Sequence, residues 1–284
     1  LNLEIRNGLV RRFFLRGEEV EGDSFILCTG GKSFPRTGST GDGYRFAQRA
    51  GHTIIPPAPA LCPVKTVEKW PALASGLDLR NVSLTLRLGD TVLSSRFGEL
   101  SLARFGISGP IAMDMSKEIA AACEAGSPSL SIDLKPALDI SVLAARIGRD
   151  LKKFAGRAFR DSLGDLMPKA LIPAVLELSS IPGEKRAETI TEEEIAGLAG
   201  LLKGKPLRPA GLLGFDWAIV TSGGVNLKEV DPRTMGSKIV GNLFFAGEIL
   251  DLDAPTGGFN LQMCWSTGWV AGESAAAAGS LGHI

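Results

Sequence analysis

The sequence predicts a mixed chain, in which α/β structure at the two ends is combined with an inserted α+β part. Near each end an apolar strand-like run stops at glycine: residues 24–28 lead into Gly30-Gly31, and residues 243–246 stop at Gly247. A glycine pair, Gly257-Gly258, then opens a run with helical apolar spacing. The middle of the chain is strand-like first and helical afterwards, which indicates a separate unit inserted between the two ends.

The length and charge of the chain limit the class of protein. Its 284 residues are 44% hydrophobic, which is enough to bury a sizeable core in more than one lobe. Lys plus Arg and Asp plus Glu both number 31, so no excess charge favours nucleic acid or a membrane surface. No apolar run approaches the roughly 18 residues of a membrane span, and no signal peptide precedes the fold. We therefore expect a cytoplasmic protein.

The number and spacing of cysteine and histidine residues argue against metal sites, disulfides and a histidine-based catalytic triad. The four cysteines are far apart and lack CxxC spacing, so they predict reduced thiols and neither a zinc site nor a disulfide framework. Only two histidines are present, which argues against a histidine-based triad or metal cluster. We expect no bound metal.

The first residues predict a small antiparallel meander. Two glycine-containing dipeptides, Asn7-Gly8 and Arg16-Gly17, suit tight hairpin turns. The strand-like segments that they separate are residues 3–6, 9–15 and 18–21.

A strand, a polar loop and a helix follow the meander. Residues 24–28 predict the apolar strand, and residues 42–50 predict a helix that ends at Gly51. Asp42, at the start of this helix, is suited to cap it. His52, just beyond the helix, is expected to be structural rather than catalytic.

The inserted part begins with strands. Proline-rich residues 55–63 mark a domain boundary. Pro110 suits the first turn of a helix over residues 111–125. The strand-like segments of this part are residues 64–67, 84–88, 91–95 and 130–134.

The second half of the insertion is helical. Thr191-x-x-Glu194 forms a capping box at the start of its last helix. The predicted helices cover residues 142–154, 163–178 and 192–203, and residues 207–220 return to strand-like sequence.

The C-terminal strand, turn and helix suit a large phosphate- or ring-bearing ligand. Glycines at Gly257-Gly258 let the backbone approach a ligand, and N–H groups at a helix start attract negative charge. The carboxylate of Glu248, at the strand end, suits the hydroxyls of a sugar or ribityl chain. An ordinary βα unit with a glycine-rich loop is the alternative.

Four motifs along the whole chain resemble one family, in its order. They are AGE…TGGFN-Q in residues 246–262, CTGG with SFPRTGSTGDG in 28–43, FGELSLARFGISGP in 97–110, and TSGGV with EVDPRTMGS in 221–237. The sequence is thus similar to the BaiN/RdsA-type (YhiN-like) flavoproteins. Ala103-Arg104 departs from the usual Thr-His of that family, so these positions receive no role.

The resemblance implies a Rossmann-like FAD-binding domain and a set of cofactor-binding residues. Glu248 would accept hydrogen bonds from ribityl or ribose hydroxyls, and backbone N–H groups of residues 259–261 would face the pyrimidine edge of the flavin. The cofactor-binding residues are Gly30, Gly31, Gly41, Asp42, Gly43, Gly247, Glu248, Gly257, Gly258, Phe259, Asn260 and Leu261.

The resemblance also implies the domain organisation. The FAD-binding domain would comprise residues 1–60 and 208–284, with a β-rich half of the insert over 61–135 and a helical half over 136–207. Flavoproteins of this kind begin with a GxGxxG strand–turn–helix, which these residues lack. We therefore expect this chain to be the larger C-terminal part of a longer protein.

The implied function is that of an FAD-dependent oxidoreductase. Family members are linked to NAD(P)H-dependent reduction of unsaturated steroid-like small molecules, so NAD(P)H is the expected electron donor, although no second dinucleotide motif is present. The alternatives are a non-catalytic flavin-binding or interaction protein and an inactive truncated chain. A flavoenzyme acting on tRNA is a third interpretation, against which the zero net charge argues.

The expected partner is a small-molecule substrate, with neither nucleic acid nor membrane, and self-association is left open. The catalytic acid is not assigned by the sequence: Arg36, Arg104 and Asp251 are unranked candidates.

Overall fold

The computed structural model describes residues 2–15 and 18–280, which form two compact units. The first unit combines the two ends of the chain, up to Cys62 and from Gly214, and the second is Pro63–Leu213. Residues 208–213, predicted to belong to the first of these, are therefore part of the second. The reason is that β12 (Pro209–Leu212) pairs with β6 (Val64–Thr66) in its sheet.

The first unit begins with the predicted antiparallel meander. β1 (Asn2–Arg6), β2 (Leu9–Leu15) and β3 (Glu18–Val20) form a three-stranded sheet in that order. Asn7 and Gly8 turn the chain between β1 and β2 with φ values of 53° and 70°, as a tight hairpin requires. The second predicted turn, Arg16-Gly17, lies outside the described residues.

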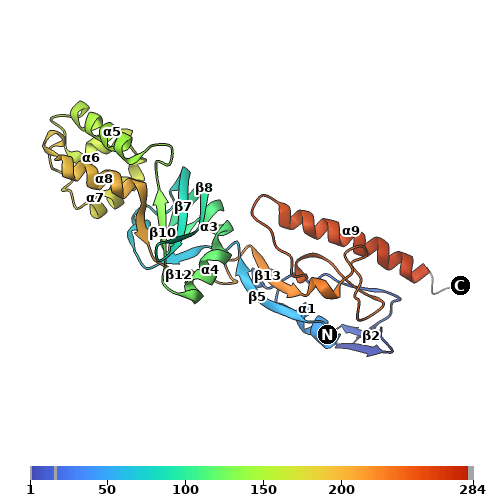
Figure 1. Ribbon diagram of the computed structural model, residues 1–284. Helices are drawn as coiled ribbons and strands as arrows, with labels where there is room; N and C mark the ends of the chain where they lie inside the picture. Colours follow the sequence, from blue (N-terminus) through green and yellow to red (C-terminus); the bar gives the residue numbers. More distant parts are fainter. Residues whose placement is uncertain (1, 16–17, 281–284) are drawn as a thin grey trace. The chain divides into compact units, whose positions relative to one another are not determined.

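Two further strand pairs bring distant parts of the first unit together, of which β5 and β13 are labelled in Figure 1. β4 (Phe25–Leu27) runs parallel to β14 (Leu243–Phe245), so both strands end at the same edge. β5 (Ile54–Ala60) is antiparallel to β13 (Val220–Val225). The predicted boundary segment is thus itself a strand: a two-stranded ribbon tolerates its prolines because proline N–H groups are not needed on an edge.

Helices complete the first unit. α1 (Asp42–Arg49) and α9 (Phe259–Ser280) follow the predicted starts, and α9 is the long red helix in Figure 1. The N-cap of α1 is Gly41 rather than Asp42, which is the first helical residue. Short 3-10 turns lie at η1 (Pro35–Thr37), η5 (Leu227–Glu229) and η6 (Gly247–Ile249).

The second unit contains a seven-stranded antiparallel sheet of order β11-β10-β7-β8-β9-β6-β12. Its other strands are β7 (Asp78–Leu88), β8 (Thr91–Ala103), β9 (Gly106–Ser108), β10 (Pro128–Asp133) and β11 (Lys205–Leu207). The predicted strand over 207–220 is interrupted: β12 ends at Leu212, and Gly214 beyond it has a φ of 91°.

Two of the predicted helices of the second unit are broken into shorter pieces. The expected helix 111–125 is divided at Met115 into α3 (Pro110–Asp114) and α4 (Ser116–Ala125). The expected helix 163–178 is interrupted at Pro168, because proline disrupts a helix interior, whereas Pro173 lies in the first turn of α7, where proline is tolerated. The pieces there are α6 (Phe159–Ser162), η2 (Leu163–Asp165), η3 (Lys169–Leu171) and α7 (Ile172–Ser179); the unit also has α2 (Trp70–Leu73), α5 (Ile140–Lys153), η4 (Ala187–Thr189) and α8 (Glu192–Gly204).

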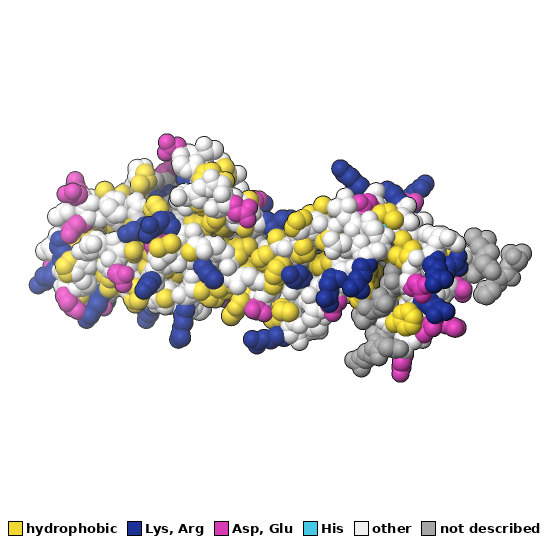
Figure 2. All heavy atoms as spheres, turned by 90° about the horizontal axis from the view of Figure 1, so that it is seen from below, with side chains coloured by type: hydrophobic (Ala, Val, Ile, Leu, Met, Phe, Trp, Pro, Cys, Tyr) yellow, Lys and Arg dark blue, Asp and Glu magenta, His cyan; other side chains and the backbone are white. Residues whose placement is uncertain are grey.

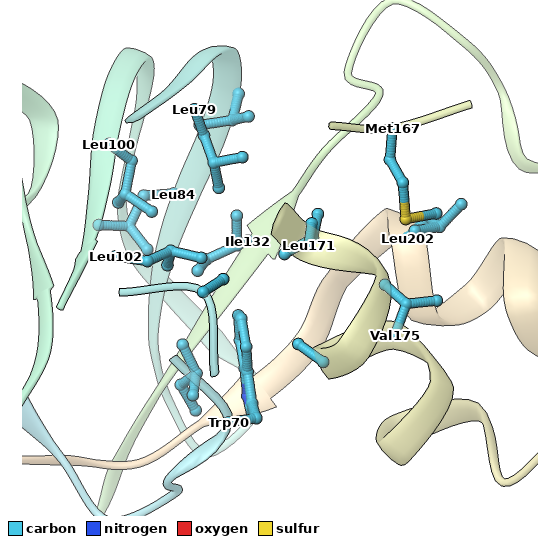
Figure 3. Packing of buried hydrophobic residues seen from close by; sticks show 14 of the residues in the cluster. Trp70, Leu79, Leu84, Leu100, Leu102, Ile132, Met167, Leu171, Val175 and Leu202 are labelled. Carbon is cyan, nitrogen blue, oxygen red and sulfur yellow. The ribbon is translucent and has the colours of Figure 1, made fainter. Parts of the chain in front are cut away.

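One core joins the sheet and the helices of the second unit. Figure 3 shows Leu84 and Leu102 of the sheet on one side, Leu171 and Leu202 of the helical part on the other, and Trp70 between them. Since the β-rich and helical halves share one continuous set of buried side chains, they fold as a single unit.

The predicted capping box of α8 is present and makes a stability test. Thr191 Oγ1 accepts from the backbone N–H of Glu194, and the Glu194 carboxylate accepts from the N–H of Thr191. We expect Thr191→Ala to lower the free energy of unfolding by about 1 kcal/mol, because the cap is lost. Thr191→Ser, which keeps the hydroxyl, should retain most of it; equal unfolding free energies for the alanine variant and the parent in denaturant titrations would contradict this.

Candidate cofactor site

Three segments of the first unit meet at Thr221. The backbone N–H of Thr221, on β13, donates to Oε1 of Glu248 at 2.8 Å. A β-carbon on Gly31 would lie 2.3 Å from Thr221 Oγ1 and 2.5 Å from Glu248 Oε1. The backbone after β4 therefore packs directly against these two side chains, and only glycine, which has no β-carbon, fits at position 31. The predicted residues Gly31 and Glu248 are brought together, and Thr221 lies between them.

The remaining glycines of the second motif allow close packing around the same turn. A β-carbon on Gly43 would lie 1.9 Å from Thr29 Oγ1, and one on Gly41 would lie 2.7 Å from Lys32 Cγ. Gly41 also has φ of 78°, a conformation that favours glycine. At Gly30, with φ of 74°, the nearest atom to an added β-carbon is Ser39 Oγ at 3.3 Å.

The Glu248 carboxyl group is partly buried. Burial raises its pKa, and hydrogen bonds from Thr221 act in the opposite direction. The hydroxyl of Tyr44 points to the backbone carbonyl of Glu248 at 3.5 Å, and burial raises the pKa of Tyr44 far above its usual range. Tyr44 is therefore a protonated packing residue at neutral pH.

Gly247 is fixed to the middle of α9. Its backbone N–H donates to Thr267 Oγ1 at 2.9 Å, and the Thr267 hydroxyl donates in turn to the carbonyl of Met263 at 2.7 Å. Gly247 has φ of 76°, and a β-carbon there would lie 3.6 Å from Cys264 Sγ. The end of β14 is thereby held against α9.

The first turn of α9 is held by Asn260. Asn260 Oδ1 accepts from the N–H of Ala254 at 2.9 Å, while its Nδ2 donates to the carbonyl of Ala254 at 2.8 Å. Before it, Gly257 and Gly258 have φ values of 113° and 89°. A β-carbon on Gly258 would meet no atom within 4 Å. Asn260 therefore ties the first turn of α9 to the loop before it, and the space beside Gly258 is open.

The exposed face of α9 carries large apolar side chains. Phe259 and Leu261, both predicted site residues, are 58% and 59% exposed, and Trp265 and Trp269 are 66% and 70% exposed. The Trp pair is four residues apart, so both indoles lie on one side of the helix.

Several candidates lie apart from this cluster or have other partners. The Asp42 carboxylate forms an ion pair with Arg45, and hydrogen bonds from Thr40 and Arg45 lower its pKa. Arg104 belongs to the second unit. No group of three or more His, Cys, Asp or Glu side chains among residues 2–15 and 18–280 is placed to hold a metal ion. Within the same residues, no helix is both long and apolar enough to span a membrane.

A buried histidine network, which the sequence did not indicate, lies beside β14. His52 Nε2 is 2.8 Å from Ser237 Oγ, and Nδ1 is 3.4 Å from a carboxylate oxygen of Glu229. This row has the order of a hydrolase triad, but Ser237 Oγ accepts from the N–H groups of Ile239 and Val240. Both lone pairs of the hydroxyl are thus used by backbone N–H groups, which argues against Ser237 as a nucleophile. The network is structural, as expected for His52.

This network predicts a pH-dependent stability. Burial lowers the pKa of His52 below its ordinary value of 6.5, although Glu229 acts to raise it. Below pH 6.5 the unfolded chain binds a proton that the folded chain does not, so the free energy of unfolding should fall as the pH decreases from about 7.5 to 5.5. Denaturant titrations at several pH values measure this slope. A slope unchanged in His52→Gln would contradict the assignment; Glu229, whose pKa is lowered by Thr53, titrates below this range.

The parallel β4–β14 pair, with glycine turns at the edge where both strands end, places the first unit in the α/β class. The chain belongs to the HI0933-like family, whose Rossmann-domain model matches residues 4–274. The predicted BaiN/RdsA-type membership and Rossmann-like fold class are thus confirmed.

Three curated relatives show what the chain is similar to. It is 35% identical over 92% of its residues to a 3-dehydro-bile acid delta(4,6)-reductase from Clostridium scindens. It is 29% and 27% identical, over 95% and 94% of its residues, to ribosomal RNA dihydrouridine synthases from Haemophilus influenzae and Escherichia coli. The chain spans 64–65% of the length of these proteins. All three names are those of enzymes.

Proposed function

We propose that this chain is the cofactor-binding part of an FAD-dependent oxidoreductase. The observation that carries the proposal is the convergence of a glycine turn, Thr221 and the partly buried Glu248 carboxylate at the end of the parallel strands. Family membership supports the assignment, because a flavin or nucleotide cofactor suits a Rossmann-type fold among reductase relatives.

The residues present fit such a cofactor. Gly258 leaves open space beside the start of α9, and its positive φ excludes most side chains. The first N–H groups of a helix have no acceptor within it, so those of Phe259, Asn260 and Leu261 can bind an electronegative ring edge. When bound, FAD supplies the chemistry of hydride and electron transfer.

Each side of the site has a distinct role in the proposal. Glu248 accepts hydrogen bonds from ribityl or ribose hydroxyls through the carboxylate that Thr221 orients. The positive end of the 22-residue helix α9 stabilises negative charge on the ring edge. Asn260, held by Ala254, keeps the helix start in place.

The proposed substrate is an unsaturated small molecule, with NAD(P)H as electron donor. The relative with 35% identity is named as a reductase of a bile acid, which is a steroid, and this supports a steroid-like substrate class.

An RNA substrate is the second candidate, because two relatives are named as ribosomal RNA dihydrouridine synthases. The charge distribution favours the small molecule. The sequence has equal numbers of basic and acidic residues, and on the face in Figure 2 the Lys and Arg side chains are dispersed among acidic and apolar ones. RNA recognition generally uses a concentrated basic surface.

Anaerobic spectroscopy tests the proposal. The full-length protein is purified, incubated with FAD, freed of excess cofactor, and mixed with NADH or NADPH without oxygen. We expect retained flavin absorption that is bleached by one donor and restored by an enone steroid. Absence of retained flavin would refute the proposal, while flavin that neither donor bleaches would favour the non-catalytic alternative. Reoxidation by an rRNA fragment and not by the steroid would favour the RNA substrate.

A further inference from the structure

Thr221 ties the turn after β4 to the Glu248 carboxylate. Its hydroxyl oxygen accepts from the backbone N–H groups of Lys32 at 2.8 Å and Ser33 at 3.1 Å, and lies 3.0 Å from Ser33 Oγ. Its own backbone N–H donates to Glu248 Oε1 at 2.8 Å. Thr221 is fully buried, so water does not compete for these bonds.

The hydrogen-bonding capacity of the Thr221 hydroxyl is used completely. A hydroxyl has one proton and two lone pairs, and the two N–H groups of Lys32 and Ser33 occupy both lone pairs. Its proton is therefore donated, to Ser33 Oγ or to the adjacent carboxylate of Glu248. The Thr221 hydroxyl thus uses both lone pairs and its proton within this cluster.

The turn cannot move independently of Thr221. There is no room for a β-carbon at Gly31, because Thr221 Oγ1 would be 2.3 Å away and Glu248 Oε1 would be 2.5 Å away. The backbone of the turn, the hydroxyl and the carboxylate are thus in contact, and a shift in one displaces the others.

We propose that Thr221 is a positioning residue for the cofactor: it holds the turn over residues 30–33 and the Glu248 carboxylate in the relative arrangement in which they bind a flavin nucleotide. This role rests on the proposed FAD site. Thr221 acts through its two neighbours and makes no contact with the cofactor itself.

The charge state of Glu248 provides a measurable consequence. Burial raises the pKa of this carboxyl group, and hydrogen bonds from Thr221 lower it. Loss of the hydroxyl removes part of the lowering effect, so the carboxylate takes up a proton at higher pH. A protonated Glu248 accepts fewer hydrogen bonds from cofactor hydroxyls.

The test compares Thr221→Val, which keeps the shape and removes the hydroxyl, with Thr221→Ser, which keeps the hydroxyl. FAD affinity is measured by fluorescence titration between about pH 5.5 and 8.5. We expect the valine variant to bind FAD at least about tenfold more weakly than the parent. As the pH is lowered, its affinity should begin to fall at a higher pH than that of the parent. The serine variant should follow the parent in both respects. A valine variant with the affinity and pH profile of the parent would overturn the proposal.

A second measurement separates this proposal from the proposed function. Amide hydrogen exchange at Lys32 and Ser33, without FAD, should be slow in the parent and the serine variant and fast in the valine variant. If the full-length parent protein binds no flavin, the FAD site is refuted, and the positioning role with it. If the parent binds flavin and these amides stay protected in the valine variant, only the positioning role of Thr221 is refuted.

Discussion

Gly258→Val is expected to abolish retention of FAD while the second unit stays folded. Gly258 has φ of 89°, which a β-branched residue adopts only at a cost of about 1–3 kcal/mol. Its added side chain would also enter the open space beside the first N–H groups of α9, where the proposed cofactor approaches. FAD titration measures the affinity, and circular dichroism with thermal unfolding reports on the fold.

The matched control for this variant is Gly76→Val. Gly76 has φ of 88° and likewise no atom within 4 Å of an added β-carbon, but it lies in the second unit. The two valines therefore impose similar backbone strain at different places. Loss of flavin in the Gly258 variant alone would support the site; full flavin occupancy in that variant would show that this turn does not contact the cofactor.

Glu248→Ala is expected to weaken FAD binding by about 1.5–3 kcal/mol, or roughly 10- to 150-fold, the scale of a hydrogen bond to a charged group. Because the substitution also leaves the N–H of Thr221 without its acceptor, Glu248→Gln is the necessary comparison. Its amide oxygen can still accept from Thr221, but its NH₂ group cannot accept from a hydroxyl. We expect an intermediate affinity for glutamine. Parent-like affinity in both variants would remove Glu248 from the site.

Local patterns in the sequence determined many of the elements, because their causes are local. The Asn7-Gly8 hairpin, the capping box at Thr191 and the start of α9 after Gly258 each depend on residues within one turn. Such signals depend on backbone preference and nearby hydrogen bonds, so they are readable without the rest of the chain. The expected helix 111–125 could not be predicted correctly from local patterns. It is broken at Met115, and Met115 is fully buried in the core.

The arrangement of the candidate site was decided by the tertiary structure. Glycine motifs and the resemblance indicated Gly31 and Glu248, but the residue that joins them, Thr221, is separated from Lys32 by 189 positions. Its role depends on the pairing of β13 with β5 and of β14 with β4, and these non-local contacts leave no periodic trace in the sequence. The His52–Ser237 bond, across 185 positions, escaped prediction for the same reason. Sequence patterns therefore identified which segments carry glycine and acid, whereas only long-range packing determined which of their atoms meet.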